Sequence, residues 1–278
     1  MKHKLATCVL ALLPIAGLSE EVPDTLRGIW ASPSCAAPED TLVIYRSFYL
    51  WLGQEETALT GLAMPVTQTD NWTRLEESDG YPNFFQLLPD GKLRETFLPE
   101  NAEFDSSPKD DWQTTDYESC QGNLPRNEAL LHGEATALLE VASNAQAVCQ
   151  TDRQACASVL FAGIDVSGDG ALSTAEIARL FRVAAYVAAV SEDEPANNDE
   201  LAGVMAASLP IGPLMASAMV NSFDYDNDGA LSLAELSQDR GTLIEQLEPD
   251  TGGEINSRLN QMKEALKPLG RLLENFGQ

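Results

Sequence analysis

The stretch that decides the fold is Asp165-Val-Ser-Gly-Asp-Gly-Ala-Leu-Ser-Thr-Ala-Glu176. A second stretch, Asp224-Tyr-Asp-Asn-Asp-Gly-Ala-Leu-Ser-Leu-Ala-Glu235, repeats the pattern later in the chain. Both place oxygen-bearing side chains at positions 1, 3, 5, 9 and 12, glycine at position 6 and leucine at position 8. Acidic turns are common, but two copies with the same offsets in one chain indicate a shared purpose.

This spacing suits a calcium ion, and we expect two Ca²⁺ ions. Ca²⁺ takes about six to eight oxygen ligands, which short side chains on alternate residues can supply. Glycine at position 6 permits the sharp turn that brings these side chains together. The expected ligands are Asp165, Ser167, Asp169, the carbonyl of Ala171, Ser173 and Glu176 in the first loop, and Asp224, Asp226, Asp228, the carbonyl of Ala230, Ser232 and Glu235 in the second.

On these residues, the region from about 150 to 245 resembles the EF-hand family. The resemblance implies a helix on each side of each loop and a short contact between the paired loops at position 8. It implies nothing about the first 125 residues. The second loop offers four carboxylates and the first offers three. Because more ligand charge usually tightens calcium binding, we predict that the second site is the stronger one.

The two loops begin 59 residues apart, which is more than a compact pair of hands needs. The excess contains an acidic stretch, Ser191 to Glu200, and an apolar stretch, Leu201 to Leu209. We expect an inserted helix here, interrupted by Pro210 and Pro213. A final amphipathic helix is expected over Ile255 to Phe276.

The composition changes near residue 125. All four tryptophans lie before that point, and the later part is rich in Ala and Leu. Aromatic and β-branched runs favour strands, whereas Ala and Leu favour helices. Asp90-Gly91, between the apolar runs Phe84 to Leu88 and Leu93 to Phe97, predicts a hairpin turn. The expected fold is therefore α+β: a small antiparallel β sheet or barrel over residues 20–125, followed by an all-α EF-hand pair domain over residues 126–278.

Residues 1–19 have the pattern of a secretory signal. Lys2 and Lys4 precede the uncharged apolar run Leu5 to Leu18, which is short for a bilayer span. A short N-terminal membrane anchor is the alternative interpretation. With the signal removed, we expect no stable membrane insertion and a periplasmic or secreted protein.

The cysteines agree with export. After Cys8 four remain, and an even number in an exported chain favours disulfides. Three pairings are possible, and we favour Cys35 with Cys120 and Cys149 with Cys156, since each pair stays within one expected domain. The second pair can close only if a helix breaks between its cysteines, as a capping box beginning at Thr151 predicts.

Charge and histidine content exclude several functions. The formal net charge of -26 repels nucleic acid and anionic lipid, so cations are the favoured partners. His132 is the only histidine besides His3. A three-histidine metal site is therefore impossible, zinc binding is disfavoured, and no histidine-based catalytic site is expected.

The expected function is calcium ion binding by a structural or sensor module that is not an enzyme. Two alternatives stay open. In one, the β-rich part binds a ligand or a partner, such as an envelope or extracellular protein, and calcium is accessory. In the other, the chain is an enzyme with accessory calcium sites, of which the sequence identifies no catalytic residue.

Overall fold

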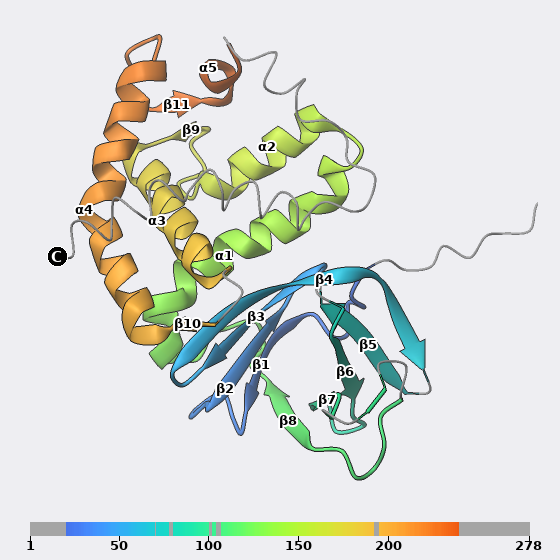
Figure 1. Ribbon diagram of the computed structural model, residues 1–278. Helices are drawn as coiled ribbons and strands as arrows, with labels where there is room; N and C mark the ends of the chain where they lie inside the picture. Colours follow the sequence, from blue (N-terminus) through green and yellow to red (C-terminus); the bar gives the residue numbers. More distant parts are fainter. Residues whose placement is uncertain are drawn as a thin grey trace, which may run out of the picture.

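The computed structural model describes residues 21–69, 71–77, 80–99, 102–103, 107–191 and 195–238 (Figure 1). Two predictions lie outside these residues: the signal segment, 1–19, and the amphipathic helix expected over Ile255 to Phe276.

Eight strands form a closed antiparallel barrel (Figure 1). Each strand pairs with its neighbour in sequence, and the first strand also pairs with the eighth. The strands are β1 (Gly28–Ser32), β2 (Asp40–Ile44), β3 (Phe48–Gly53), β4 (Glu56–Thr69), β5 (Trp72–Glu77), β6 (Pro82–Leu87), β7 (Leu93–Phe97) and β8 (Thr114–Ser119). Gly91 has a φ of +85° in the turn between β6 and β7, which a residue with a Cβ rarely adopts.

Over residues 126–191 and 195–238, the part after the barrel that the structure describes, there are five helices and three very short strands. The helices are α1 (Arg126–Cys149), α2 (Arg153–Ile164), α3 (Thr174–Val190), α4 (Asn198–Phe223) and α5 (Leu233–Gln238), and the strands are β9 (Ala171–Leu172), β10 (Ala196–Asn197) and β11 (Leu231–Ser232). The expected interruption by Pro210 and Pro213 is wrong, because α4 is continuous through both. Both prolines lie on the exposed side of α4, where a missing backbone donor is least costly.

Both faces of β2 and β3 are buried, and this joins the barrel to the helices. Leu42 and Ile44 face the barrel interior, whereas Val43 and Leu50 pack outward against the helices. The outward side chains share one core with residues of α1, α3 and α4, including Tyr186, which is fully buried.

The expected fold class was wrong. The helical half is not an all-α domain that follows a separate sheet, because β10 pairs with β4 and extends the barrel sheet to nine strands. Asn198 at the start of α4 also donates to the Gly53 carbonyl (2.9 Å) and accepts from the Thr57 hydroxyl (2.7 Å). The outer faces of β2 and β3 are apolar and need cover, which the helices provide.

Two disulfides are present, Cys35–Cys120 and Cys149–Cys156, with Cα–Cα separations of 5.6 and 4.4 Å. The chain breaks between α1 and α2, as the second bond requires, although the capping residue is Asp152 and not Thr151. The Asp152 carboxylate accepts from the amides of Gln154 and Ala155. Such bonds persist in oxidising compartments, so the disulfides weakly indicate an exported protein.

Among the described residues, α4 alone is long and apolar enough to cross a membrane by length and composition. Leu209 and Leu214 on it are well exposed. Its N-terminal end follows β10 and its C-terminal end leads into the second acidic loop, so both ends are held by the fold.

Candidate metal centre in the paired acidic loops

The first acidic loop joins α2 to α3, and Asp165 organises its turn. One carboxylate oxygen accepts from the Gly168 amide (2.7 Å), and the other accepts from the Gly170 amide (2.8 Å). These backbone bonds, that from Gly170 contributing most, lower the pKa of Asp165. The Gly170 φ of +87° permits the turn.

Glu176 closes the first loop from the first turn of α3. Its carboxylate accepts from the Ser167 amide (2.9 Å) at the far side of the loop, and from the Ser173 amide and hydroxyl. Burial disfavours the charged carboxylate, but these hydrogen bonds outweigh it and hold the pKa of Glu176 at about 2. Glu176 is therefore ionised and faces back into the loop.

The second acidic loop, between α4 and α5, repeats this arrangement. Asp224 accepts from the amides of Asp228 (3.1 Å) and Gly229 (2.9 Å), and the Gly229 φ is +89°. Glu235 accepts from the Tyr225 amide (2.8 Å), as Glu176 accepts from Ser167. The second position-12 glutamate thus also reaches back across its loop.

In the second loop, carboxylate oxygens of Asp224, Asp226 and Glu235 lie within 4.8 Å of one another. The Asp228 amide bonds Asp226 and lowers its pKa, but burial and the neighbouring carboxylates outweigh this, and the pKa of Asp226 is raised. The three groups therefore repel one another, and a cation between them would relieve that repulsion. Among the described residues, the first loop holds no comparable group of three carboxylates.

The remaining predicted ligands make matching hydrogen bonds in the two loops. Asp169 accepts from the Ala171 amide (3.0 Å), and Asp228 accepts from the Ala230 amide (2.9 Å). The Ser173 hydroxyl caps α3 and touches Glu176, and the Ser232 hydroxyl lies 2.8 Å from Glu235.

Position 4 of each loop was not singled out in the sequence. Gly168 and Asn227 both have positive φ, +71° and +61°. Glycine and asparagine tolerate this conformation better than most residues, so their occurrence at the same position of both loops was a usable signal.

The two loops meet at β9 and β11. Ala171 and Leu172 pair antiparallel with Ser232 and Leu231. Both leucines are buried in a core with residues of α3 and α4, including Ile177. The loops are therefore mechanically connected through position 8.

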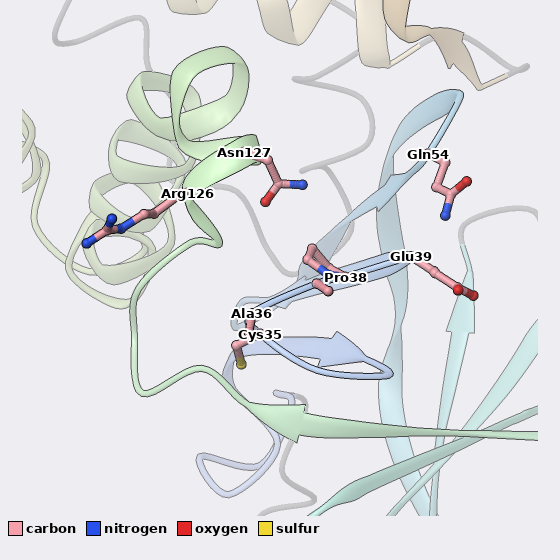
Figure 2. A pocket seen from close by; sticks show the side chains of 8 residues that line it. Cys35, Ala36, Pro38, Glu39, Gln54, Arg126 and Asn127 are labelled. Atoms are coloured by element: carbon pink, nitrogen blue, oxygen red, sulfur yellow. The ribbon is translucent and has the colours of Figure 1, made fainter.

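Two features outside the acidic loops lack the chemistry of a functional site. His132 is buried, its Nδ1 lies 2.8 Å from the Tyr186 hydroxyl, and burial lowers its pKa to about 4, so it is placed as a packing residue. A surface pocket is lined by Cys35, Ala36, Ala37, Pro38, Glu39, Gln54, Arg126 and Asn127. Figure 2 shows Glu39 and Arg126 pointing away from each other, so the pocket gathers no reactive pair.

Comparison with family models, curated proteins and solved structures finds no match for this chain.

Proposed function

We propose that the chain binds two calcium ions, one in each acidic loop. The observation that carries this proposal is the repeated frame: in both loops a glutamate at position 12 reaches back to the backbone of position 2 or 3. In the second loop this arrangement already holds carboxylate oxygens of three residues within 4.8 Å of one another, which lowers the ordering cost of binding an ion there.

The donor set favours calcium. The side chains in the loops that can act as ligands offer only oxygen, and no nitrogen or sulfur, which suits hard cations. The glutamates can each supply two oxygens, and coordination above six suits Ca²⁺ better than octahedral Mg²⁺.

A structural role for the ions fits the packing better than a sensor role. Helix α3 carries Glu176 at its start and Tyr186, Val187 and Val190 in the core shared with the barrel. Ordering of the first loop would therefore stabilise the core in which the helices pack against the barrel. We place the protein in the periplasm or outside the cell, where calcium is plentiful. The two disulfides and the signal-like first residues support this location.

The direct test is titration calorimetry of chelator-stripped, disulfide-intact protein with calcium. We expect uptake of two ions and a higher melting temperature, because an ion that binds only the folded state stabilises it. The double variant Glu176→Gln, Glu235→Gln should lose both effects. Asp116→Asn, which removes a carboxylate from the outer face of the barrel, is the control and should keep them. Absence of heat and of any melting shift at millimolar calcium would refute the proposal.

A further inference from the structure

The barrel interior carries three carboxylates. Each acid lies two residues from a leucine of the interior core on the same strand. The pairs are Asp40 and Leu42 on β2, Glu77 and Leu75 on β5, and Glu95 and Leu93 on β7. Side chains two residues apart on a strand point to the same face, so all three carboxylates face inward. Glu95 is only 2% exposed.

Two of these acids belong to two separate hydrogen-bonded clusters, one around Glu95 and one around Glu77. The Tyr117 hydroxyl donates to Glu95 (2.8 Å), and the Tyr49 hydroxyl donates to Glu77 (2.6 Å). Asn83 donates its amide to Glu77 (2.6 Å) and to the Tyr49 hydroxyl (3.0 Å). The first cluster joins β7 to β8, and the second joins β3, β5 and β6. The charges of Asp40 and Glu77 both act on Glu95, so the three carboxyls are electrostatically coupled.

These two clusters have too few hydrogen-bond donors. Ionised carboxylates only accept hydrogen bonds. The side-chain oxygen of Asn83 is buried and has no partner among the described residues, and Asn83 is 1% exposed. Among the described strand residues that share the inward register, none is Lys, Arg or His. An unpartnered buried acceptor that adjoins Glu77, in a barrel whose interior also carries Asp40 and Glu95, calls for a ligand that brings N–H donors and positive charge.

Aromatic rings surround these acceptors. Trp30, Tyr49, Phe85 and Tyr117 belong to the same interior core, and Trp51 packs against it and bonds to Asp40. Aromatic faces attract cations and also cover alkyl groups. A ligand with a charged nitrogen and a short apolar chain would satisfy both kinds of surface.

Two of the three inward-facing acids are also accessible to solvent. Asp40, Trp51 and Glu77 are partly exposed, whereas Glu95 is buried. Because neighbouring strands alternate in direction, the start of β2 and the end of β5 lie at the same barrel end, so Asp40 and Glu77 lie near that end. A ligand entering there meets these acids first and Glu95 deeper inside.

We propose that the barrel interior binds a small organic cation of the primary alkylammonium class. Its N–H groups would bond Glu95, Glu77 and the free oxygen of Asn83, and its alkyl chain would lie against the aromatic rings. Burial raises the pKa of Glu95 to about 7, against the lowering effect of the Tyr117 hydrogen bond and with help from Asp40 and Glu77. A bound cation would keep that carboxyl charged. This site is separate from the calcium loops.

The test is calorimetry and tryptophan fluorescence of the full disulfide-intact protein with n-butylammonium, at a pH above 7. We expect saturable binding with calcium present, and no binding of n-butanol, which has the same chain without the charge. Calcium itself should not compete. The calcium-loop double variant, Glu176→Gln with Glu235→Gln, should bind butylammonium as the parent does, so failure of the calcium proposal would be recognised separately.

Glu95→Gln keeps the side-chain shape and removes the charge, and it should weaken butylammonium binding by about tenfold or more. Asp116→Asn is the matched control, since Asp116 pairs with Arg94 on the outer face of the same two strands. If Glu95→Gln does not fold, Glu77→Gln serves instead, with the same expected loss, because it removes the charge of the other carboxylate that contacts the ligand and lies at the partly exposed end. Absence of binding to the parent, equal binding of butanol, competition by calcium, or unchanged affinity in the folded variant would each overturn the proposal.

Discussion

Leu172 and Leu231 lie opposite each other in the two-stranded pairing of β9 with β11, and both side chains are buried. Each follows the position-7 alanine of its own acidic loop. Because this pairing joins the two backbones, displacement of one loop also displaces the backbone of the other. The two proposed calcium sites should accordingly behave as a coupled pair.

Leu231→Ala tests this coupling. Truncation of a fully buried leucine should lower the free energy of unfolding by about 2–5 kcal/mol. It should also weaken calcium binding in the first loop, although Leu231 supplies no ligand to that loop. Urea denaturation and calorimetry measure the two effects. Leu214→Ala, at a position 70% exposed on α4, is the control and should stay within about 0.5 kcal/mol of the parent. A normal first site in Leu231→Ala would show that the loops act independently.

The two sites should differ in affinity. Three carboxylates of the second loop, those of Asp224, Asp226 and Glu235, already lie within 4.8 Å of one another, and Asp228 adds a fourth. Glu235→Gln should therefore remove the tighter of the two binding events seen by calorimetry, and Glu176→Gln should remove the weaker one, each with a loss of about tenfold or more. A larger loss of affinity from Glu176→Gln would contradict the order.

Local features were predictable because their causes lie within a few residues. The Asp90-Gly91 turn, with Gly91 at φ +85°, joins β6 and β7 as its sequence indicates. The position-6 glycines of both loops also have positive φ, and both position-12 glutamates face back into their loops. Whether an ion occupies those loops stays a prediction.

Features that depend on distant partners were not predictable. Ala196 and Asn197 form a strand because β4 lies beside them, and nothing in the acidic stretch around them indicates this. Strand alternation puts Glu95 on the same face as Leu93, but a charged side chain favours exposure. Only the pairing of β7 with β6 and β8 in a closed barrel buries that face. The fold class failed for the same reason: periodicity located the elements, but it did not reveal that the outer faces of β2 and β3 require the helices.

The two disulfides should contribute unequally to stability. Cys35–Cys120 spans 85 residues, and Cys149–Cys156 spans 7. Loop-closure entropy predicts that the first stabilises the folded state by roughly 4–5 kcal/mol and the second by roughly 2–3 kcal/mol. Urea denaturation of the Cys35→Ser, Cys120→Ser variant and the Cys149→Ser, Cys156→Ser variant, both saturated with calcium, measures the losses. Equal losses, or a greater loss from the second pair, would show that the shorter bridge holds more native structure than its chain length implies.

His132 should make stability depend on pH. Burial lowers its pKa from 6.5 to about 4 in the folded protein, whereas the unfolded chain titrates near the ordinary value. Between these two values the unfolded state therefore binds more protons, and acidification favours unfolding. The contribution of His132 is complete above a pH of about 6.5, falls as the pH drops toward 4, and amounts to about 3 kcal/mol over that interval.

Other buried groups change the free energy of unfolding with pH in the opposite direction, so the measurement must remove their contribution. Burial raises the pKa values of Glu95 and Glu128 to about 7. The stability that these two groups contribute to the folded protein is therefore lost as the pH rises from 4.5 through 7. His132→Gln keeps a polar group near Tyr186 and leaves both glutamates in place. The free energy of unfolding of the parent minus that of this variant, measured by urea denaturation at several pH values, isolates the histidine. The difference should be constant above a pH of about 7 and should fall as the pH approaches 4; a difference that stays flat across this range would show that His132 is not held neutral by burial.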